Sequence, residues 1–375
     1  GNKVEQVVLP AIAEHGTYVP PTIIEIKSLA DLKREVFGPV LHVIRFRRAD
    51  LDKLIDDING SGYGLTFGLH TRLDETIAHV TSRIKAGNLY VNRNIIGAVV
   101  GVQPFGGEGL SGTGPKAGGP LYLRRLMHGA PPLQLPGGNS PRRDAMLAPL
   151  RALREHLAPP PSGTAHAPAG TAHAPAGTAH APAGTAHAPS VDAASTSADA
   201  AEPAALHAAC DALLASTPVE HSLLLPGPTG ERNSYLLLPR DAVLCVAADA
   251  ATADGDRLFM LAHALAAGAK AVWADDAGAR ALHAGLPAAV RERVVLAADV
   301  ARAAYDAALL MGDAEAARAC SRMLAAREGA IVGLQAGAAG ERCIGVFSLE
   351  PLVVERSLSV NTAAAGGNAS LMTIG

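Results

Sequence analysis

The first 209 residues of this 375-residue chain contain no cysteine at all, and the whole chain contains only four. These are Cys210, Cys245, Cys320 and Cys343. Such sparse thiols exclude a disulfide-stapled secreted scaffold, and their spacing is unlike that of a structural zinc site. The sequence therefore predicts reduced thiols and a cytoplasmic protein.

Long apolar runs are missing as well. No segment reaches the roughly eighteen consecutive apolar residues that a transmembrane helix needs. The first residues also lack the basic segment, apolar core and cleavage site of a signal peptide. Because the chain opens on Gly1 within a structured-looking sequence, we expect it to be a truncated, C-terminal piece of a longer protein.

An excess of one charge is also absent, since 32 Lys and Arg stand against 35 Asp and Glu, and aromatic residues make up only 3% of the chain. A nucleic-acid-binding surface needs a basic stripe, often with interleaved aromatics. We therefore predict no nucleic-acid partner for this chain. What the chain does have is 49% hydrophobic residues, enough for two compact domains with cores.

Residues 1–129 alternate helix-like and strand-like patterns, as expected for an α/β unit. Helices with one apolar face are predicted at 50–60 and 74–87, and strands at 65–70 and 89–92.

Residues 130–204 are predicted to form a linker rich in Pro, Ala, Gly and His. Four seven-residue units run from Gly163 to Ser190, and each carries a proline that breaks helices. Their histidines are His166, His173, His180 and His187. A metal cluster is the alternative interpretation, but a flexible tract does not hold ligands in tetrahedral geometry, so we predict no metal site.

Residues 205–345 again alternate strand and helix, which predicts a parallel, Rossmann-like sheet covered on both faces. Residues 249–254 follow the first strand and are acidic where a phosphate cradle needs glycines, so no dinucleotide is expected there. Residues 346–375 are predicted to be an extended tail. Strands are expected at 243–248, 271–274, 294–297, 307–311 and 330–333, and helices at 254–267 and 313–327.

A glycine-rich stretch between residues 97 and 119 is a candidate binding loop, because closely spaced glycines let backbone N–H groups approach a carboxylate. A merely flexible surface loop fits poorly with the apolar run 98–100 and with Phe105. The Gly-x-Gly-x-x-Gly string at 107–112 is not interpreted as a dinucleotide fingerprint, since no predicted strand leads into it.

Four segments carry a family resemblance. Residues 34–39, Arg-Glu-Val-Phe-Gly-Pro, and residues 92–107, ending in Gln-Pro-Phe-Gly-Gly, resemble the end of an aldehyde dehydrogenase catalytic domain. Residues 112–120 are similar to the branch that oxidises glutamate γ-semialdehyde, and residues 361–375 resemble the tail of the bacterial proline utilization A family. The resemblance implies an α/β chain made of the C-terminal part of a dehydrogenase domain, a disordered linker, and a degenerate dehydrogenase-like domain whose tail covers a tunnel.

The same resemblance implies roles for five residues. Glu35 would accept hydrogen bonds from the nicotinamide ribose, and Phe37 would pack near the nicotinamide. Gly97 and Ala98 would bind the substrate carboxylate through their N–H groups, and Phe105 would line the aliphatic chain. The implied cofactors are NAD, bound partly by this chain, and FAD, bound only by a missing N-terminal part. The implied substrate is L-glutamate γ-semialdehyde, and the implied parent is a homo-oligomer.

No catalytic residue is assigned to this chain, because the family's nucleophilic cysteine and its upstream glutamate have no counterpart here. Cys343 echoes the nucleophile turn but lies far too late in the chain, so we predict a packed core thiol. Glu341, Glu350 and Glu355 are predicted to be solvated. We therefore expect the isolated chain to be inactive; the alternative is a stand-alone, non-catalytic scaffold or lid of the same superfamily.

Overall fold

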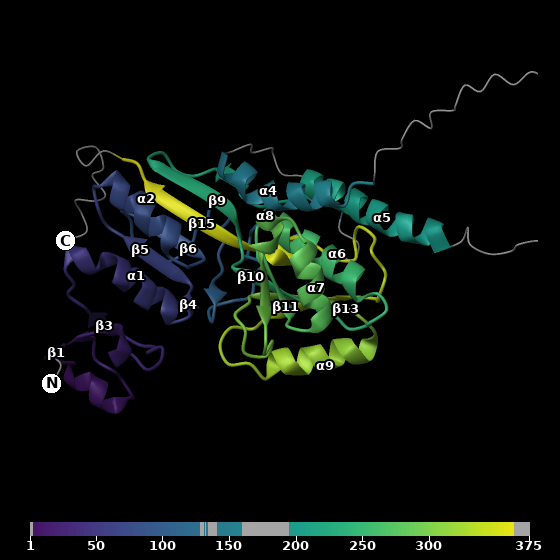
Figure 1. Ribbon diagram of the computed structural model, residues 1–375. Helices are drawn as coiled ribbons and strands as arrows, with labels where there is room; N and C mark the ends of the chain where they lie inside the picture. Colours follow the sequence, from purple (N-terminus) through teal and green to yellow (C-terminus); the bar gives the residue numbers. More distant parts are fainter. Residues whose placement is uncertain (1–2, 128–130, 132, 134–140, 160–194, 364–375) are drawn as a thin grey trace, which may run out of the picture.

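The computed structural model describes residues 3–127, 131, 133, 141–159 and 195–363. Within this part of the chain, two five-stranded sheets carry most of the core. One is entirely parallel and lies within the second half of the chain. The other is mixed and joins the first part of the chain to the last (Figure 1).

The parallel sheet has the strand order β12-β11-β10-β13-β14, with the first strand in the centre. Its side chains alternate between two cores: Val243 and Cys245 lie in one, and Leu244 lies in the other. Both faces are therefore covered, which confirms the predicted Rossmann-like layout. The strands are β10 (Ala242–Ala247), β11 (Lys270–Ala274), β12 (Val294–Ala297), β13 (Ala307–Met311) and β14 (Gly333–Gly337).

Helices cover both faces of this sheet. Buried side chains of α6 (Ala253–Ala266) pack in the core that contains Val243, whereas Cys320 and Leu324 of α9 (Ala314–Ala325) pack on the opposite face. Two shorter helices, α7 (Ala277–Gly285) and α8 (Ala288–Arg291), connect β11 to β12.

The mixed sheet has the order β5-β6-β15-β9-β8, so the strand nearest the C-terminus lies between strands from the two halves of the chain. Leu358 is opposite Leu89 on the parallel neighbour β6 and opposite Ser234 on the antiparallel neighbour β9. The predicted tail thus contains a central strand. The five strands are β5 (Thr66–Leu69), β6 (Asn88–Val91), β8 (Ser222–Leu225), β9 (Glu231–Pro239) and β15 (Val353–Asn361), and the 3-10 helix η4 (Glu350–Leu352) leads into β15.

Two amphipathic helices form a core with β6, as predicted. Ile55 of α1 (Leu51–Gly60) and Val80 of α2 (Asp74–Arg83) are buried together with Leu89. Burial of this apolar face, and not a strong cap, stabilises α1, because Asp50 makes no capping hydrogen bond.

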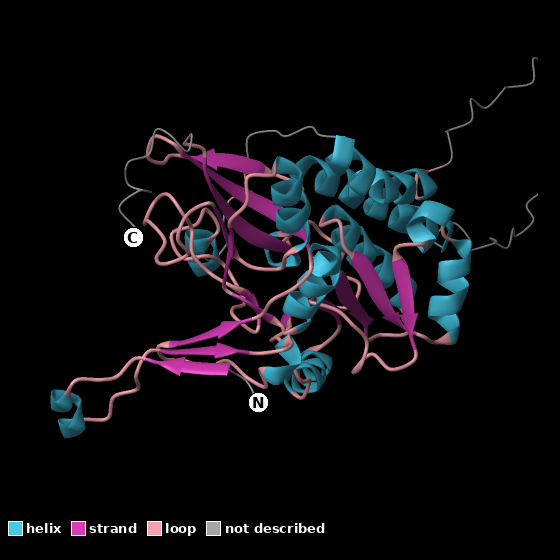
Figure 2. Cartoon of the chain, turned by 90° about the vertical axis from the view of Figure 1, so that its left-hand side faces the viewer, coloured by secondary structure: helices cyan, strands magenta, loops and turns pink. Residues whose placement is uncertain are grey.

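Residues 3–50 form a small three-stranded sheet that projects from the rest of the chain (Figure 2). Large apolar side chains are exposed here, including Val8 at 92% and Phe37 at 87%. An accumulation of exposed apolar groups is typical of a surface that contacts further protein. The elements are β1 (Lys3–Gln6), η1 (Ala11–His15), β2 (Thr22–Glu25), η2 (Leu29–Asp31), β3 (Val40–Val43) and η3 (Arg48–Asp50).

Parts of the predicted linker, 130–204, are helical in the described residues, which include the helix α4 (Pro141–His156) and the start of α5 (Ser195–Ser216). Leu147, Leu150 and Leu153 lie three residues apart and are all buried, which gives α4 an apolar stripe. Packing against the core outweighs the helix-breaking tendency of an internal proline. The four repeats at 163–190 lie outside the described residues.

The described residues contain no helix long and apolar enough to cross a membrane. Nor do they contain a group of three or more His, Cys, Asp or Glu side chains that could hold a metal ion. The repeat histidines are not among them.

Candidate functional site

The site begins in the loop that follows β6. Gly97 adopts the left-handed conformation, with φ of +73°, which a glycine accepts without strain. Among the described residues, the N–H groups of Gly97 and Ala98 make no hydrogen bond. Two neighbouring backbone donors are therefore free at the position where the sequence predicts a carboxylate-binding turn.

The entry to this loop is fixed by Asn92, which has a φ of +56°. Its side-chain amide donates to the carbonyl of Thr71 at 2.9 Å and its side-chain oxygen accepts from the N–H of Thr71 at 3.0 Å. Asparagine is one of the few residues besides glycine that adopt the left-handed region, and these two bonds to a distant segment hold Asn92 in place.

The exit from the loop is held by paired backbone bonds between Phe105 and Ala117, of 3.0 and 2.8 Å. Next to this pair, the buried Nζ of Lys116 donates to Asn88 at 3.0 Å and to the carbonyl of Gly106. Desolvation lowers the pKa of Lys116 to about 8. Gly87 must be glycine here, because a Cβ would lie 1.8 Å from the oxygen of Gly106.

A carboxylate from β9 contacts both ends of residues 93–103, which we call the 93–103 loop. Glu231 accepts a hydrogen bond from Arg93 at 2.6 Å and another from Gln103 at 2.8 Å. Sequence reasoning assigned no role to these three residues. Gln103 stands in the quoted Gln-Pro-Phe-Gly-Gly string, but nothing local in the sequence identifies Glu231 as its partner.

Glu35 and Phe37 lie on the exposed segment before β3. Glu35 makes no hydrogen bond or ion pair with any described residue, so its carboxylate is free to accept two hydroxyl groups. No such bond connects this segment to the 93–103 loop within the described chain. The structure thus places Gly97, Ala98 and Phe105 in one loop region, and Glu35 and Phe37 on a different segment.

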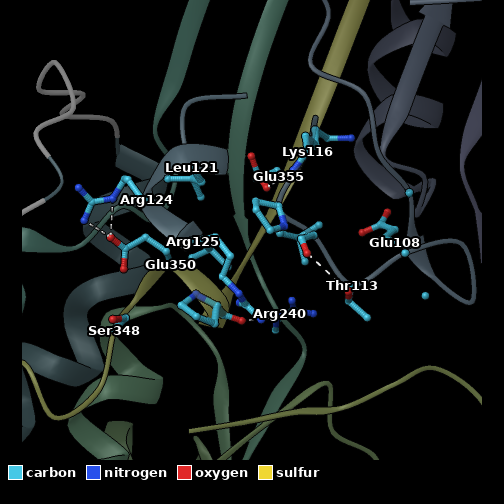
Figure 3. A pocket seen from close by; sticks show the side chains of 18 of the residues that line it. Glu108, Thr113, Lys116, Leu121, Arg124, Arg125, Arg240, Ser348, Glu350 and Glu355 are labelled. Carbon is cyan, nitrogen blue, oxygen red and sulfur yellow. Dashed lines mark hydrogen bonds and ion pairs between the residues drawn. The ribbon is translucent and has the colours of Figure 1, made fainter. Parts of the chain in front are cut away.

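A cavity of about 500 Å³ lies between the two halves of the chain. Figure 3 shows Lys116 and Glu355 on one side and Arg124 with Glu350 on another. The walls come from β7 (Glu108–Gly109) and the turn after it, α3 (Tyr122–Leu126), and the segment from Gly345 into β15. β7 pairs with β4 (Tyr63–Gly64), so the string at 107–112 belongs to a strand pair and its turn.

The prediction that Glu355 is solvated is wrong. It accepts hydrogen bonds from the hydroxyl of Tyr235 at 2.6 Å and from the N–H of Lys116 at 2.8 Å. Desolvation raises the pKa of Glu355 and also that of Tyr235. Glu350 is also largely buried, and it pairs with Arg124 at 2.5 Å. The position of β15 and η4 between the two halves of the chain explains why both acids have protein partners.

The prediction that Cys343 is a core thiol is also wrong, because this cysteine is exposed. Its neighbour Arg342 turns inward instead and pairs with the fully buried Asp256 at 2.9 Å. Asp256 lies in the first turn of α6, directly after the central strand β10, and also accepts from the N–H of Gly340. The carboxylate of Asp256 thus lies at the N-terminal end of α6.

Comparison with known proteins gives a consistent picture. Residues 4–128 match the Aldehyde dehydrogenase family. The chain is 49% identical to "Bifunctional protein PutA" of Salmonella typhimurium over 96% of the chain and 24% of that protein. It is 43% identical to "1-pyrroline-5-carboxylate dehydrogenase" of Bacillus subtilis over 29% of the chain and 21% of that protein.

Among solved structures, proline utilization A from Corynebacterium freiburgense matches with a TM-score of 0.56 and 19% identity, covering 98% of this chain and 29% of that one. At this identity the likeness concerns the fold alone. The chain spans about a quarter of the length of the bifunctional relatives that it matches.

Proposed function

We propose that the chain forms part of an enzyme that oxidises L-glutamate γ-semialdehyde, on the premise that residues 4–128 match the aldehyde dehydrogenase family. The enzyme is bifunctional in this proposal: it oxidises proline to glutamate, with FAD bound outside this chain. The support is the similarity of almost the whole chain to "Bifunctional protein PutA", together with the similarity of residues in its first part to a 1-pyrroline-5-carboxylate dehydrogenase.

The observation that carries the proposal is the pair of free N–H groups at Gly97 and Ala98. Two neighbouring free backbone donors suit a carboxylate, because hydrogen bonds to a charged acceptor are the stronger kind. Phe105 lies at the exit of the same loop and is partly exposed, so it offers an apolar surface to the three-carbon stem of the substrate. These residues bind and orient; none of them takes part in bond making.

NAD is the cofactor in this proposal, and when bound it supplies the hydride acceptor. Glu35 fits a ribose diol, because its exposed carboxylate has no partner within the described chain, and Phe37 beside it offers an exposed aromatic face. The nucleophilic cysteine of the family must come from elsewhere, since residues 1–209 contain none. The isolated 375 residues are therefore inactive in this proposal.

The second half of the chain has a covering role. The segment from Gly345 into β15 closes one wall of the 500 Å³ cavity, and the opposite wall is built from the first half of the chain. We assign to residues 205–363 the task of closing this space from solvent, as part of a route between two active sites.

The test is the formation of NADH from L-glutamate γ-semialdehyde by the native protein that contains this chain, compared with butanal, which lacks the carboxylate. We expect a strong preference for the semialdehyde. Ala98→Pro removes one donor and should raise KM for the semialdehyde about ten- to a hundredfold, because a charge-assisted hydrogen bond contributes on the order of 1.5–3 kcal/mol. Equal use of both aldehydes by the unaltered protein would contradict the proposal.

A further inference from the structure

Both ends of the 93–103 loop are held by one side chain from the other half of the chain. The Oε2 atom of Glu231 lies 2.6 Å from a guanidinium nitrogen of Arg93, and its Oε1 atom lies 2.8 Å from Nε2 of Gln103. Glu231 follows these two residues by 138 and 128 positions. A single carboxylate therefore closes the base of the loop.

Gln103 extends this contact into the middle of the loop. Its Oε1 accepts a 3.0 Å hydrogen bond from the N–H of Val99, the residue directly after Ala98. Gln103 is only 3% exposed, so its amide has no water to replace a lost partner. A displacement of Glu231 would thus move the side chain of Gln103 and, through it, Val99, which lies next to the free donor of Ala98.

The carboxylate is itself held by the mixed sheet. Glu231 begins β9 and is opposite Asn361 of β15. Asn233, two residues further along β9, is fully buried and accepts from both Gln103 and Ser359. On the other side, the guanidinium of Arg93 lies over the ring of Tyr90 at 5.0 Å. The residues around Glu231 that are named here either lie in strands or contact residues that do.

We propose that Glu231 is a positioning residue, which holds the 93–103 loop so that the N–H groups of Gly97 and Ala98 point at the substrate carboxylate. This inference rests on the proposed function of those two donors. It assigns to the second half of the chain a direct influence on substrate affinity, through a contact that residues 4–128 cannot make by themselves.

We expect the loss of loop positioning to change KM more than kcat. Bonds to a remote carboxylate are present in the bound substrate and in the transition state alike, and losing such uniform binding raises KM while kcat stays the same. An aldehyde without a carboxylate makes no use of the loop. A comparison of two substrates therefore separates loop positioning from general damage to the fold.

The experiment is the Glu231→Gln variant of the native protein that contains this chain, assayed with L-glutamate γ-semialdehyde and with butanal. The amide can accept from only one of its two partners, so the loop loses one anchor. We expect KM for the semialdehyde to rise about tenfold, with kcat within about twofold and kcat/KM for butanal unchanged. Equal losses on both substrates, or no loss on either, overturns the proposal.

Two further variants keep the test decisive if Glu231→Gln weakens the sheet. Gln103→Met lies in the loop and should reproduce the selective rise in KM, and the double variant should be no worse than the poorer single one, since both remove the same contact. Asp241→Asn is the matched control, because it breaks the ion pair with Lys85 across the same junction, and neither residue makes a hydrogen bond with the 93–103 loop within the described chain. It should leave KM for both aldehydes unchanged.

The outcomes also separate this inference from the proposed function. An unaltered protein that does not prefer the semialdehyde contradicts both. An unaltered protein with that preference, combined with a Glu231→Gln variant that retains it in full, contradicts only the role of Glu231.

Discussion

The backbone N–H of Lys116 donates a 2.8 Å hydrogen bond to the carboxylate of Glu355, 239 positions later in the chain. The same carboxylate accepts from the hydroxyl of Tyr235 at 2.6 Å. One acid on β15 therefore connects the end of the glycine-rich stretch with β9, its neighbour in the sheet. These contacts hold the two halves of the chain together beside the cavity in Figure 3.

Replacing this acid should destabilise the chain. Glu355→Leu leaves the Tyr235 hydroxyl and the Lys116 N–H without an acceptor, and an unsatisfied buried donor costs about 1–3 kcal/mol. We expect a loss of free energy of unfolding in that range, measured by urea denaturation. Tyr235→Phe removes only one of the two bonds and should cost about 1 kcal/mol. A Glu355→Leu variant as stable as the unaltered chain would show that the contact contributes nothing.

Lys116 makes the stability of the chain depend on pH in the alkaline range. Its pKa falls to about 8 from an ordinary 10.5, so its favourable contribution is complete above pH 10.5 and is lost as the pH falls through 8. The difference corresponds to about 3 kcal/mol. Urea denaturation of the chain and of Lys116→Met between pH 8 and 10.5 should therefore give a rising stability that is steeper in the unaltered chain. Parallel curves would refute this.

Because of His263, the stability of the chain also rises with pH, in this case in the acidic range. Desolvation lowers its pKa to about 4 from 6.5, and it packs against the rings of Phe259 and Phe347. The unfolded chain gains a proton first as the pH falls, so stability present above pH 6.5 is lost toward pH 4. We expect His263→Leu to flatten this loss. Fluorescence of Trp273, the single tryptophan and fully buried, reports the unfolding.

Removal of β15 should separate the two halves of the chain. The strand pairs with β6 on one side and β9 on the other, and no other strand of the described residues connects β5 and β6 with β9 and β8. A chain ending at residue 352 exposes two sheet edges, which promotes association. Size-exclusion chromatography should show aggregates, and limited proteolysis should cut residues 1–126 before the parallel sheet. A monomeric, equally protected truncation would contradict the role of β15.

Local sequence patterns predicted most of the regular elements, because these depend on neighbouring residues. Val243 and Leu244 point to opposite faces of one strand, and the continuous apolar run predicted that both faces are buried. The spacing of Ile55 with its apolar neighbours predicted α1 in the same way. The α4 helix was missed because its proline-rich surroundings dominated the composition, although Leu147, Leu150 and Leu153 carry the helical spacing.

The features of the candidate site also fall into two groups, those that local sequence determines and those that depend on the tertiary structure. The sequence by itself determined that Gly97 and Ala98 lie in a glycine-rich turn before Phe105, since backbone freedom is a local property. Only the tertiary structure decided that Glu231 closes this loop, that Glu355 accepts hydrogen bonds from Tyr235 and Lys116, and that Cys343 is exposed. The reason is register: β15 selects its neighbours through hydrogen bonds with strands more than a hundred residues away, and a local pattern does not encode which strand completes a sheet.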